Sequence, residues 1–515
     1  MTQPKGPPDD GRPRSLDPKD WEDFRGKAHA ALDAMIDHVR TLRQRPVWRE
    51  ADAEAKAFFR RPLPAQGQDL AQSLAEFDRH IKPFAMGNPH PLFMGWVQGA
   101  GTPVGMVAEM LAAGLDANCG GRNHIALDVE RQIALWMAQA FGFPPEASGI
   151  FVTGASMANF LALLVAREHA AEGADIRLNG LDALKPIVTA YASREVHNCV
   201  RQAMELAGLG ARHLRLIASD ENRRMRVGDL AHAIAADRAA GFKPFLIVGT
   251  AGTVDVGAVD DLDALADLAR EEDVWFHVDG AFGALAALSP ALKPLVKGLE
   301  RADSVAFDFH KWLHVPYDAG FVLVRDPREH LKAFKADAAY LSRAPRGLAA
   351  GDPWPCDLGP DLSRGFRALK TWFTIQTFGA DLLGECIERT CRLARRLEAQ
   401  LNASPDFKMR APVALNIVCF SVAKDPDGAL AREIVMDLHE RGEAAPSLTI
   451  LDGAPAIRAA IVNHRTTQED IDRFMTLLEE ALRRARQAFA APADHPTAQT
   501  RETPHGPGRT PLSQD

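Results

Sequence analysis

The chain has 515 residues, of which 46% are hydrophobic and 25% are charged, and its formal net charge is −8. This is the composition of an ordinary folded protein with a large core, and the acidic balance with dispersed basic residues argues against nucleic-acid binding. The six cysteines show no CxxC spacing, the N-terminus lacks the apolar core of a secretory signal, and no apolar run reaches the roughly 18 residues that span a bilayer. We therefore expect reduced thiols, no membrane segment and a cytoplasmic location.

The N-terminal part of the chain is predicted to be helical. Residues 1–15 are rich in Pro, Gly and charge, which predicts disorder. Amphipathic patterns then predict helices near 18–43 and 68–82, with Pro62 and Pro64 breaking the chain between them. After an extended aromatic-bearing segment, two more apolar helices are predicted over 103–114 and 126–141.

Strands and helices alternate from residue 149 to about 330. The predicted strands are short and nearly all apolar, at 149–153, 186–190, 213–217, 245–249, 274–278, 304–309 and 320–324. The helices between them are predicted near 157–171, 195–208, 228–240 and 261–271. Short apolar strands separated by helices are typical of a mainly parallel sheet that is covered on both faces. The sequence therefore predicts an α/β large domain.

The rest of the chain predicts a lid and a small α+β domain. Residues 335–366 have little periodicity, which is typical of a functional lid or a disordered segment. Helices are predicted at 367–379, 381–402, 428–441 and 469–488, and strands at 415–421 and 456–462. Thr466 and Glu469 have the spacing of a capping box before the last helix. The chain thus divides into a disordered start, an N-terminal helical segment, a large domain, a small domain and a disordered tail, at 1–15, 16–95, 96–380, 381–489 and 490–515.

The stretch 303–313 is apolar and strand-like, and Lys311 lies near its end. A lysine beside Phe309 and Trp312 is expected to be at least partly buried, and burying an ammonium group without a partner is costly. An imine with an aldehyde cofactor removes this cost, because a desolvated lysine is a good nucleophile. A purely structural lysine beside His310 is the alternative at this point.

Residues 151–159 predict a strand, a turn of small residues and a helix. Small residues such as Ala155 let backbone N–H groups approach an anion, and the start of a helix favours negative charge. Ser156 adds a hydroxyl donor. A phosphate group matches these features, although an ordinary capped helix shows the same pattern.

Two further residues have chemical potential at strand ends. His197 is predicted where a helix follows a strand, so its ring can stack on a planar group or move a proton, with a helix-capping histidine as the alternative. Asp279 ends an apolar strand and needs a partner, such as a pyridinium N–H, with the small Ala281 leaving room for a ring. A structural aspartate and a metal ligand are the alternatives. No second acid with ligand spacing lies nearby, so no metal is predicted.

A phosphate cradle, a stacking histidine, a ring-nitrogen acid and an imine lysine together match what pyridoxal phosphate needs on an α/β scaffold. From about 15 to 488 the chain also resembles the group II pyridoxal-phosphate-dependent amino-acid decarboxylases, which include the aromatic-L-amino-acid, histidine and glutamate decarboxylases. The motifs that carry this resemblance are His310-Lys311-Trp312, residues 277–281, Gly252-Thr253, His197, Ala155-Ser156, His90-Pro91 with Phe93, and the C-terminal set Arg458, Asn463 and 466–470.

The resemblance implies a type I pyridoxal-phosphate-dependent transferase fold. It also implies an obligate homodimer with composite active sites, in which the N-terminal helices pack across the dimer. Thr253 and His310 are then expected at the cofactor, and Tyr340 on a mobile catalytic loop. The implied reaction is decarboxylation of an L-amino acid at a cofactor that Lys311 anchors. The resemblance also implies that Tyr340 protonates the substrate carbon, and we expect His197 to act as a relay.

The sequence departs from the family pattern at three places that concern the substrate rather than the cofactor. Phe309 stands where many members have proline, Met157 stands where an acid is common, and residues 363–367 replace a Gly-Arg-Arg segment. These changes leave the cofactor residues intact.

His90, Phe93 and Trp96 are the candidate walls of the substrate pocket. No arginine is obviously placed to hold a side-chain carboxylate, although Arg122 and Arg364 stay open for that role. An aromatic L-amino acid is therefore favoured over glutamate or aspartate. The alternatives are a decarboxylating aldehyde synthase, against which Tyr340 argues, another pyridoxal-phosphate aminotransferase or lyase, and a non-catalytic protein that binds the cofactor.

Overall fold

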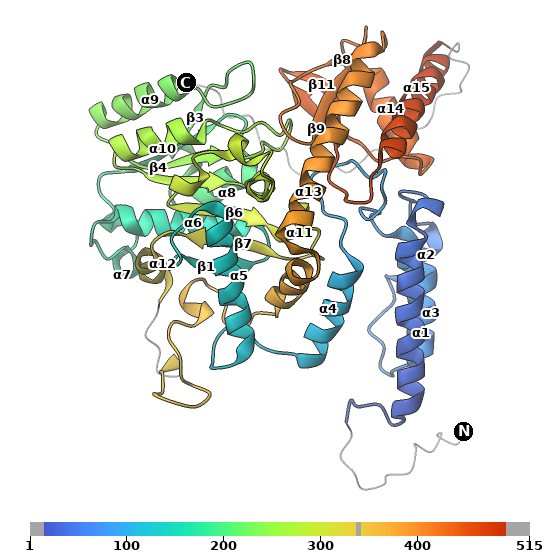
Figure 1. Ribbon diagram of the computed structural model, residues 1–515, viewed down its shortest axis with the longest axis horizontal. Helices are drawn as coiled ribbons and strands as arrows, with labels where there is room; N and C mark the ends of the chain where they lie inside the picture. Colours follow the sequence, from blue (N-terminus) through green and yellow to red (C-terminus); the bar gives the residue numbers. More distant parts are fainter. Residues whose placement is uncertain (1–14, 336–340, 491–515) are drawn as a thin grey trace.

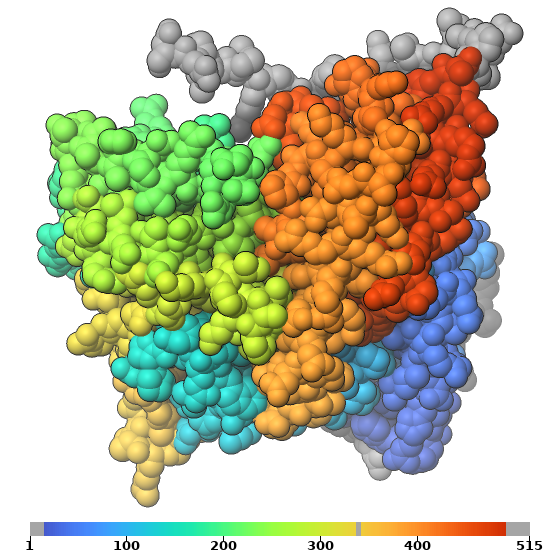
Figure 2. Space-filling model, turned by 45° about the horizontal axis from the view of Figure 1, so that its top comes forward, coloured from blue at the N-terminus to red at the C-terminus, as the bar shows by residue number. Residues whose placement is uncertain are grey.

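The computed structural model describes residues 15–335 and 341–490. The lid residue Tyr340 and most of both termini predicted to be disordered lie outside the described residues. The described chain forms a large α/β domain, a smaller domain with its own sheet, and an N-terminal helical segment (Figure 1). The N-terminal helices, in blue, lie beside the small domain, in orange and red, and both lie to one side of the large domain (Figure 2).

The large domain is built on a seven-stranded sheet with the strand order β1-β7-β6-β5-β4-β2-β3. Its strands are β1 (Ser148–Val152), β2 (Val188–Ser193), β3 (Leu214–Ile217), β4 (Lys243–Thr250), β5 (Trp275–Asp279), β6 (Ser304–Asp308) and β7 (Gly320–Val324). Pairing is parallel from β3 through β2, β4 and β5 to β6, whereas β7 is antiparallel to both of its neighbours. The prediction of a mainly parallel sheet is confirmed.

Helices cover both faces of this sheet. Helices α6 (Ala155–Ala170) and α8 (Asn198–Leu206) contribute buried residues to one face. Helices α5 (Ile125–Phe141), α9 (Val227–Ala239) and α10 (Leu262–Glu271) contribute to the core on the other face. Full coverage explains why the strands read as continuous apolar runs rather than as an alternating pattern.

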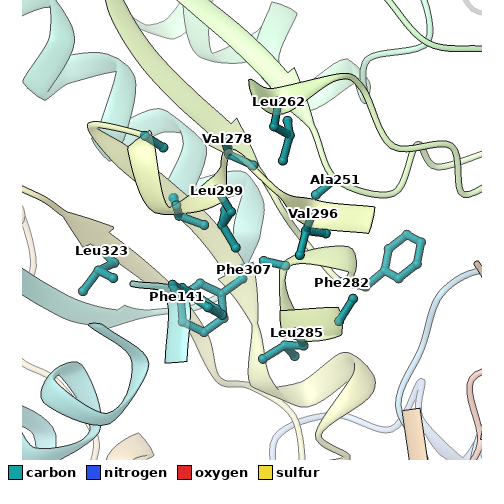
Figure 3. Packing of buried hydrophobic residues seen from close by; sticks show 14 of the residues in the cluster. Phe141, Ala251, Leu262, Val278, Phe282, Leu285, Val296, Leu299, Phe307 and Leu323 are labelled. Carbon is teal, nitrogen blue, oxygen red and sulfur yellow. The ribbon is translucent and has the colours of Figure 1, made fainter. Parts of the chain in front are cut away.

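The core on the α5 side of the sheet combines aliphatic side chains with aromatic rings, among them Phe141, Phe282 and Phe307 (Figure 3). The ring of Phe307 lies 5.0 Å from that of Phe141 and 5.0 Å from that of Phe309, both edge to face. Phe309 also stacks on Phe151 at 5.3 Å and is fully buried. Burying a Phe side chain stabilises a fold by about 1.5–3 kcal/mol. Phe309, which stands where many family members have proline, is therefore a core residue two positions before Lys311.

The small domain has a four-stranded antiparallel sheet with the order β10-β11-β9-β8. Its elements are β8 (Phe407–Met409), β9 (Ile417–Val422), α14 (Ala429–Glu440), β10 (Ser447–Leu451), β11 (Ala454–Ala460) and α15 (Gln468–Ala490). The sequence predicts β9 and β11 but not β8 and β10. Strands of three and five residues at the edges of a sheet are too short to show a periodicity.

The capping box of α15 lies one residue later than predicted. The hydroxyl of Thr467 accepts from the backbone N–H of Asp470 at 3.4 Å, and the Asp470 carboxylate accepts from the Thr467 N–H at 2.8 Å. The predicted pair Thr466–Glu469 was wrong, because Thr466 is buried and its hydroxyl donates to the carbonyl of Pro91 at 2.7 Å.

One long helix joins the two domains. The helices predicted at 367–379 and 381–402 are the two halves of α13 (Arg367–Ala403), which breaks at Gly379, where φ is +70°. Its first half packs with the core of the large domain, and its later residues, from Leu393 to Leu401, pack in the core of the small domain. Glycine is favoured at this break because side chains rarely adopt positive φ.

The N-terminal segment contains α1 (Trp21–Arg40), α2 (Ala53–Phe58) and α3 (Leu70–His80). Helix α1 buries no residue of its own, and its Lys27 pairs with Asp69, the N-cap of α3, at 3.0 Å. The segment is held by the small domain instead. Val47 donates its N–H to Gly442 O at 2.8 Å, and Met94 lies in the core of the small domain. In the described part of the chain, every helix is too short or too polar to span a bilayer.

Candidate active site

The candidate site lies at the carboxyl ends of the parallel strands, where ligands bind in open α/β sheets. Strand β6 ends at Asp308, and α11 (Phe309–Trp312) follows at once and presents Lys311. Strand β5 ends at Asp279, and β4 ends at Thr250. Because these strands are neighbours, their last side chains meet at one edge of the sheet.

A cavity of about 360 Å³ opens at this edge. The residues around it that the sequence predicts as site residues are Trp96, Ala155, Ser156, His197, Asp279, Ala281, His310 and Lys311. Other residues around it include Gln98, Asn159, Cys199, Thr250, Phe282, Asp308 and Tyr317. The structure thus brings together most of the predicted site residues, although they come from stretches far apart in the sequence.

Lys311 is held by a buried carboxylate. Its Nζ lies 2.8 Å from Oδ2 of Asp308, which is 2% exposed and whose Oδ1 accepts from the Ala155 N–H at 2.7 Å. Burial opposes the charge of Lys311, but the carboxylates of Asp308 and Asp279 outweigh burial and raise the lysine pKa above its ordinary value. Lys311 is therefore an ammonium group at neutral pH before any ligand binds.

Asp279 is buried, and its carboxylate lacks a close cation. It is 3% exposed and accepts from the Ala281 N–H at 3.2 Å. Among the described residues, no lysine, arginine or histidine nitrogen lies within 4.0 Å of it. Burial raises the pKa of Asp279, and the charges of Lys311 and His197 only partly oppose this rise. A cationic N–H donor placed in the cavity would restore the carboxylate.

His197 caps helix α8 and lies against the cavity. Its Nδ1 accepts from the Cys199 N–H at 3.2 Å, so the neutral ring carries its proton on Nε2. The helix therefore begins at Asn198 rather than at the predicted residue 195. The capping role and the site role of His197 thus coexist in one side chain.

A buried amide supports the floor of the cavity between α6 and β5. The Asn159 side chain pairs its Oδ1 with Nε2 of His277 at 2.7 Å and donates from Nδ2 to Sγ of Cys199 at 3.4 Å. His277 in turn pairs with the Ser304 hydroxyl at 2.9 Å, and burial lowers its pKa to about 3. Because His277 is neutral, it supplies no positive charge to the carboxylate of Asp279.

The segment before α4 (Pro103–Leu115) forms part of the cavity wall. It crosses directly over the lysine helix, because a Cβ at Gly99 would lie 2.1 Å from the carbonyl oxygen of His310. Trp96 lies on this wall, is half exposed and has φ of +54°. Tyr317 completes the wall, with its ring 4.3 Å from that of His310. Burial raises the pKa of Tyr317 to about 12, so its phenol keeps its proton.

Three predicted residues do not line the cavity. His90 is 6% exposed, accepts from the Leu92 N–H at 3.1 Å and has a pKa that burial lowers to about 4. Phe93 packs in the core of the small domain, since its segment pairs with Ala445. Thr253 is 1% exposed and its hydroxyl accepts from the Ala258 N–H at 3.0 Å.

Thr250 lies at the cavity in place of Thr253. Its Oγ1 is buried and has no hydrogen-bond partner among the described residues. A buried hydroxyl without a partner is costly, so a ligand that hydrogen-bonds to it is favoured. The position of Thr250 at the end of β4, like that of Asp308 at the end of β6, is the sequence signal that could have identified both residues.

The comparisons with known proteins agree with this geometry. The family model described as the pyridoxal-dependent decarboxylase conserved domain matches residues 54–423. The chain belongs to the pyridoxal-dependent decarboxylase family. Over 465 residues, this decarboxylase is 34% identical to the aromatic-L-amino-acid decarboxylase of Bacillus atrophaeus. The alignment covers 88% of this chain and 94% of the relative.

Two further matches also cover most of the chain. The decarboxylase is 26% identical over 494 residues to the phenylacetaldehyde synthase of Arabidopsis thaliana. That alignment covers 92% of this chain and 98% of the relative. The structure of Oryza sativa TDC with PLP and tryptamine superposes with a TM-score of 0.83 at 22% identity, over 91% of this chain and 99% of that chain. The fold is therefore the type I fold of the pyridoxal-phosphate decarboxylases, and pyridoxal phosphate is the cofactor of this carboxy-lyase.

Four features of the cavity of the decarboxylase fit this cofactor. A primary amine, Lys311, is available to an aldehyde. The buried Asp279 needs a cationic N–H, and the Thr250 hydroxyl needs a hydrogen-bonding partner. Ala155 and Ser156 lie at the cavity at the start of the 16-residue helix α6, where the helix end favours an anion. Because the Ala155 N–H donates to Asp308, Ser156 is the anion donor of this pair and Ala155 leaves room beside it.

Proposed function

We propose that this enzyme decarboxylates an aromatic L-amino acid to the corresponding amine and CO₂. The observation that supports the substrate class most directly is the lining of the Lys311 cavity. Trp96, Phe282 and Tyr317 lie around it, and among its described lining residues Lys311 is the only lysine or arginine. A side-chain carboxylate in this cavity would lack a cation of its own, whereas an aromatic ring has apolar surface to contact.

The two arginines that the sequence left open for a substrate carboxylate are engaged elsewhere. The buried guanidinium of Arg364 bonds to the Glu130 carboxylate at 2.6 and 3.1 Å. It also donates to the carbonyl oxygen of Cys119 at 2.8 Å and to that of Phe151 at 2.9 Å. Arg122 lies over the ring of Trp354, 4.6 Å from its centroid. Neither arginine belongs to the cavity, which favours an aromatic over an acidic substrate.

We assign roles to the residues as follows. When bound, pyridoxal phosphate supplies the electron sink for the pair that loss of CO₂ leaves behind. Lys311 would anchor the aldehyde, Asp279 would hold a proton at the ring nitrogen, and His197 and the small Ala281 would contact the ring. Ser156 would donate to the phosphate, and the small Ala155 would leave room for it. His310 borders the same cavity, and Thr250 takes the role that the family resemblance gives to Thr253.

The acid that protonates the substrate carbon is proposed to be Tyr340, with His197 as the relay. Tyr340 lies outside the described residues, so this role rests on the family resemblance and on the tyrosine content of the chain. The chain has three tyrosines. Tyr191 is buried and donates to Asp237 at 2.8 Å, which leaves Tyr317 as the only rival phenol.

We also propose a homodimer in the cytoplasm. The N-terminal helices support the dimer, because Trp21, Phe24 and Ile36 of α1 are exposed on a helix that buries nothing. Helix α4, which leads away from the cavity wall, exposes Val107, Met110, Leu111 and Leu115. A second copy of the chain would cover such apolar surface. Sedimentation of the loaded enzyme tests this, and a monomer at micromolar concentration would refute it.

The test of function is a turnover panel on purified enzyme loaded with pyridoxal phosphate. Trp, Phe, Tyr, DOPA, His, Glu, Asp and Lys are offered, and CO₂, amine, aldehyde and peroxide are measured separately. We expect CO₂ and amine in equal amounts from one or more aromatic substrates. Turnover of Glu or Asp alone would refute the aromatic assignment, and aldehyde with peroxide would assign the chain to the chemistry that the phenylacetaldehyde synthase name describes.

A further inference from the structure

Asp308 is a buried carboxylate in the cavity to which the roles above give no function. It is the last residue of β6 and is 2% exposed. Its Oδ1 is fixed by the Ala155 N–H at 2.7 Å, and its Oδ2 lies 2.8 Å from Nζ of Lys311. Because one oxygen is held by the start of α6, the other is kept in place beside the lysine nitrogen.

Among the described residues, Lys311 is the only cation on this carboxylate. Nε2 of His310 also lies near it, 3.6 Å from Oδ2, but Nδ1 of His310 accepts from the Ala319 N–H at 3.0 Å. The proton of the neutral ring is therefore on Nε2, facing Asp308. Burial lowers the pKa of His310, so the ring is a neutral donor rather than a second positive charge.

The charge balance of the cavity changes when the cofactor binds. Asp279 then has the ring nitrogen as its partner, as assigned above, and the phosphate adds negative charge. The titratable groups that face the Lys311 nitrogen or its carboxylates are Asp279, Asp308, Cys199, His197, His310 and Tyr317. Among these described residues, Asp308 is the remaining carboxylate that can balance a positive charge on the lysine nitrogen.

We propose that Asp308 is the counter-ion of the Lys311 nitrogen and keeps that nitrogen positively charged both before and after it bonds to the cofactor aldehyde. The step balances as follows. The lysine ammonium and the aldehyde form a carbon–nitrogen double bond and release one water, and the nitrogen retains one proton and one positive charge. Two of the ammonium protons leave with the aldehyde oxygen. No oxidant, reductant or other reactant is needed.

The former aldehyde carbon is more electrophilic when its nitrogen is cationic than when it is neutral, so the incoming amino group of the substrate attacks that carbon more readily. A carboxylate at 2.8 Å in a buried site favours the cationic form by direct charge pairing. Asp308 acts through Lys311 and is therefore a positioning residue.

The test is a pH titration of the visible absorption band of the loaded enzyme, without substrate. The variant is Asp308→Asn, and the matched control is Asp303→Asn, since Asp303 lies just before the other end of β6 and its carboxylate accepts from the Phe276 N–H outside the cavity. We expect Asp308→Asn to lower the pH at which the nitrogen loses its proton by about one unit or more. Asp303→Asn should leave that midpoint where it is in wild type.

A second measurement separates this role from a structural one. Pyridoxine 5′-phosphate has no aldehyde and cannot bond to Lys311, so its affinity reports only the phosphate cradle and the ring contacts. Asp308→Asn should bind this analogue at least as tightly as wild type, because the loss of a negative charge does not repel a phosphate. An unchanged titration midpoint, with or without weaker analogue binding, would overturn the counter-ion role.

If Asp308→Asn does not fold, the titration midpoint of the wild-type enzyme provides the test. This midpoint must lie above that of the adduct between pyridoxal phosphate and free Nα-acetyl-lysine. A midpoint equal to or below that of the free adduct would overturn the proposal. Neither measurement requires turnover, so the result is independent of which amino acid the enzyme decarboxylates.

Discussion

The buried ion pair between Arg364 and Glu130 gives a stability prediction that also tests the substrate assignment. The side chains of Arg364 and Glu130 are 1% and 6% exposed. The change Arg364→Met leaves the Glu130 carboxylate buried, with the Phe151 N–H at 3.0 Å as its remaining close donor, and removes donors from two carbonyl oxygens. Breaking a buried pair by removing one partner costs about 3–5 kcal/mol.

We therefore expect Arg364→Met to lower the free energy of unfolding by about 3–5 kcal/mol in urea, followed by tryptophan fluorescence. The double variant Arg364→Met with Glu130→Leu should recover most of this loss, because no unpaired charge stays buried. The exposed pair of Arg396 and Asp472 is the matched control, with side chains 41% and 45% exposed. Arg396→Met should cost less than about 1 kcal/mol.

A single variant that costs less than about 1 kcal/mol, or a double variant as unstable as the single one, would refute this reasoning. The same protein tests the substrate argument. If Arg364 held a substrate carboxylate, Arg364→Met would raise KM for an acidic substrate specifically. We expect instead that any folded fraction keeps the KM of wild type for an aromatic substrate, because Arg364 does not line the cavity.

The remaining predictions concern the site itself. Lys311→Ala should abolish turnover together with the borohydride-reducible adduct, and retention of either would exclude the lysine as the anchor. Tyr340→Phe should slow amine formation or divert the product to aldehyde, whereas Tyr317→Phe should leave the ratio of amine to aldehyde unchanged; the reverse pattern, measured by product analysis, would assign the acid to Tyr317. Gly320→Ala should weaken cofactor binding by at least tenfold in a fluorescence titration, since its Cβ would lie 2.3 Å from Cα of Gly154 beside the cradle. Gly228→Ala in α9, which meets nothing within 4 Å, is the control that should bind as wild type does.

The sequence predicts the site well where chemistry is local. Lys311 and Asp279 stand at or just after the ends of apolar strands, and a parallel sheet brings such ends together. The cradle of Ala155 and Ser156 follows a strand directly, so adjacency alone places it. These residues could be identified without tertiary contacts, because each strand end is set by the same run of apolar residues that forms the core.

The residues that sequence reasoning missed or assigned wrongly depend on where the chain turns and where a strand ends. Tyr317 reaches the cavity because the chain turns back against His310 between α11 and β7, and no periodicity reports such a turn. Phe93 is an aromatic residue of the kind that lines pockets, but its bridge to Ala445 places it in the core of the small domain. An apolar side chain does not reveal in which of two cores it is buried. Thr250 and Thr253 differ by three positions, and only the end of β4 decides which one faces the cavity.

The small domain has a core assembled from both ends of the chain. Val47 and Met94 precede the large domain, whereas the strands and helices that they pack against follow it, from the later part of α13 to α15. During synthesis the N-terminal segment therefore emerges long before the surface that receives it. The large domain, whose contacts lie mostly within its own sequence span, can fold first, and the exposed apolar side chains near residues 47 and 94 remain uncovered until the last helices leave the ribosome. Interactions with a chaperone during that interval would concern this early segment rather than the catalytic sheet.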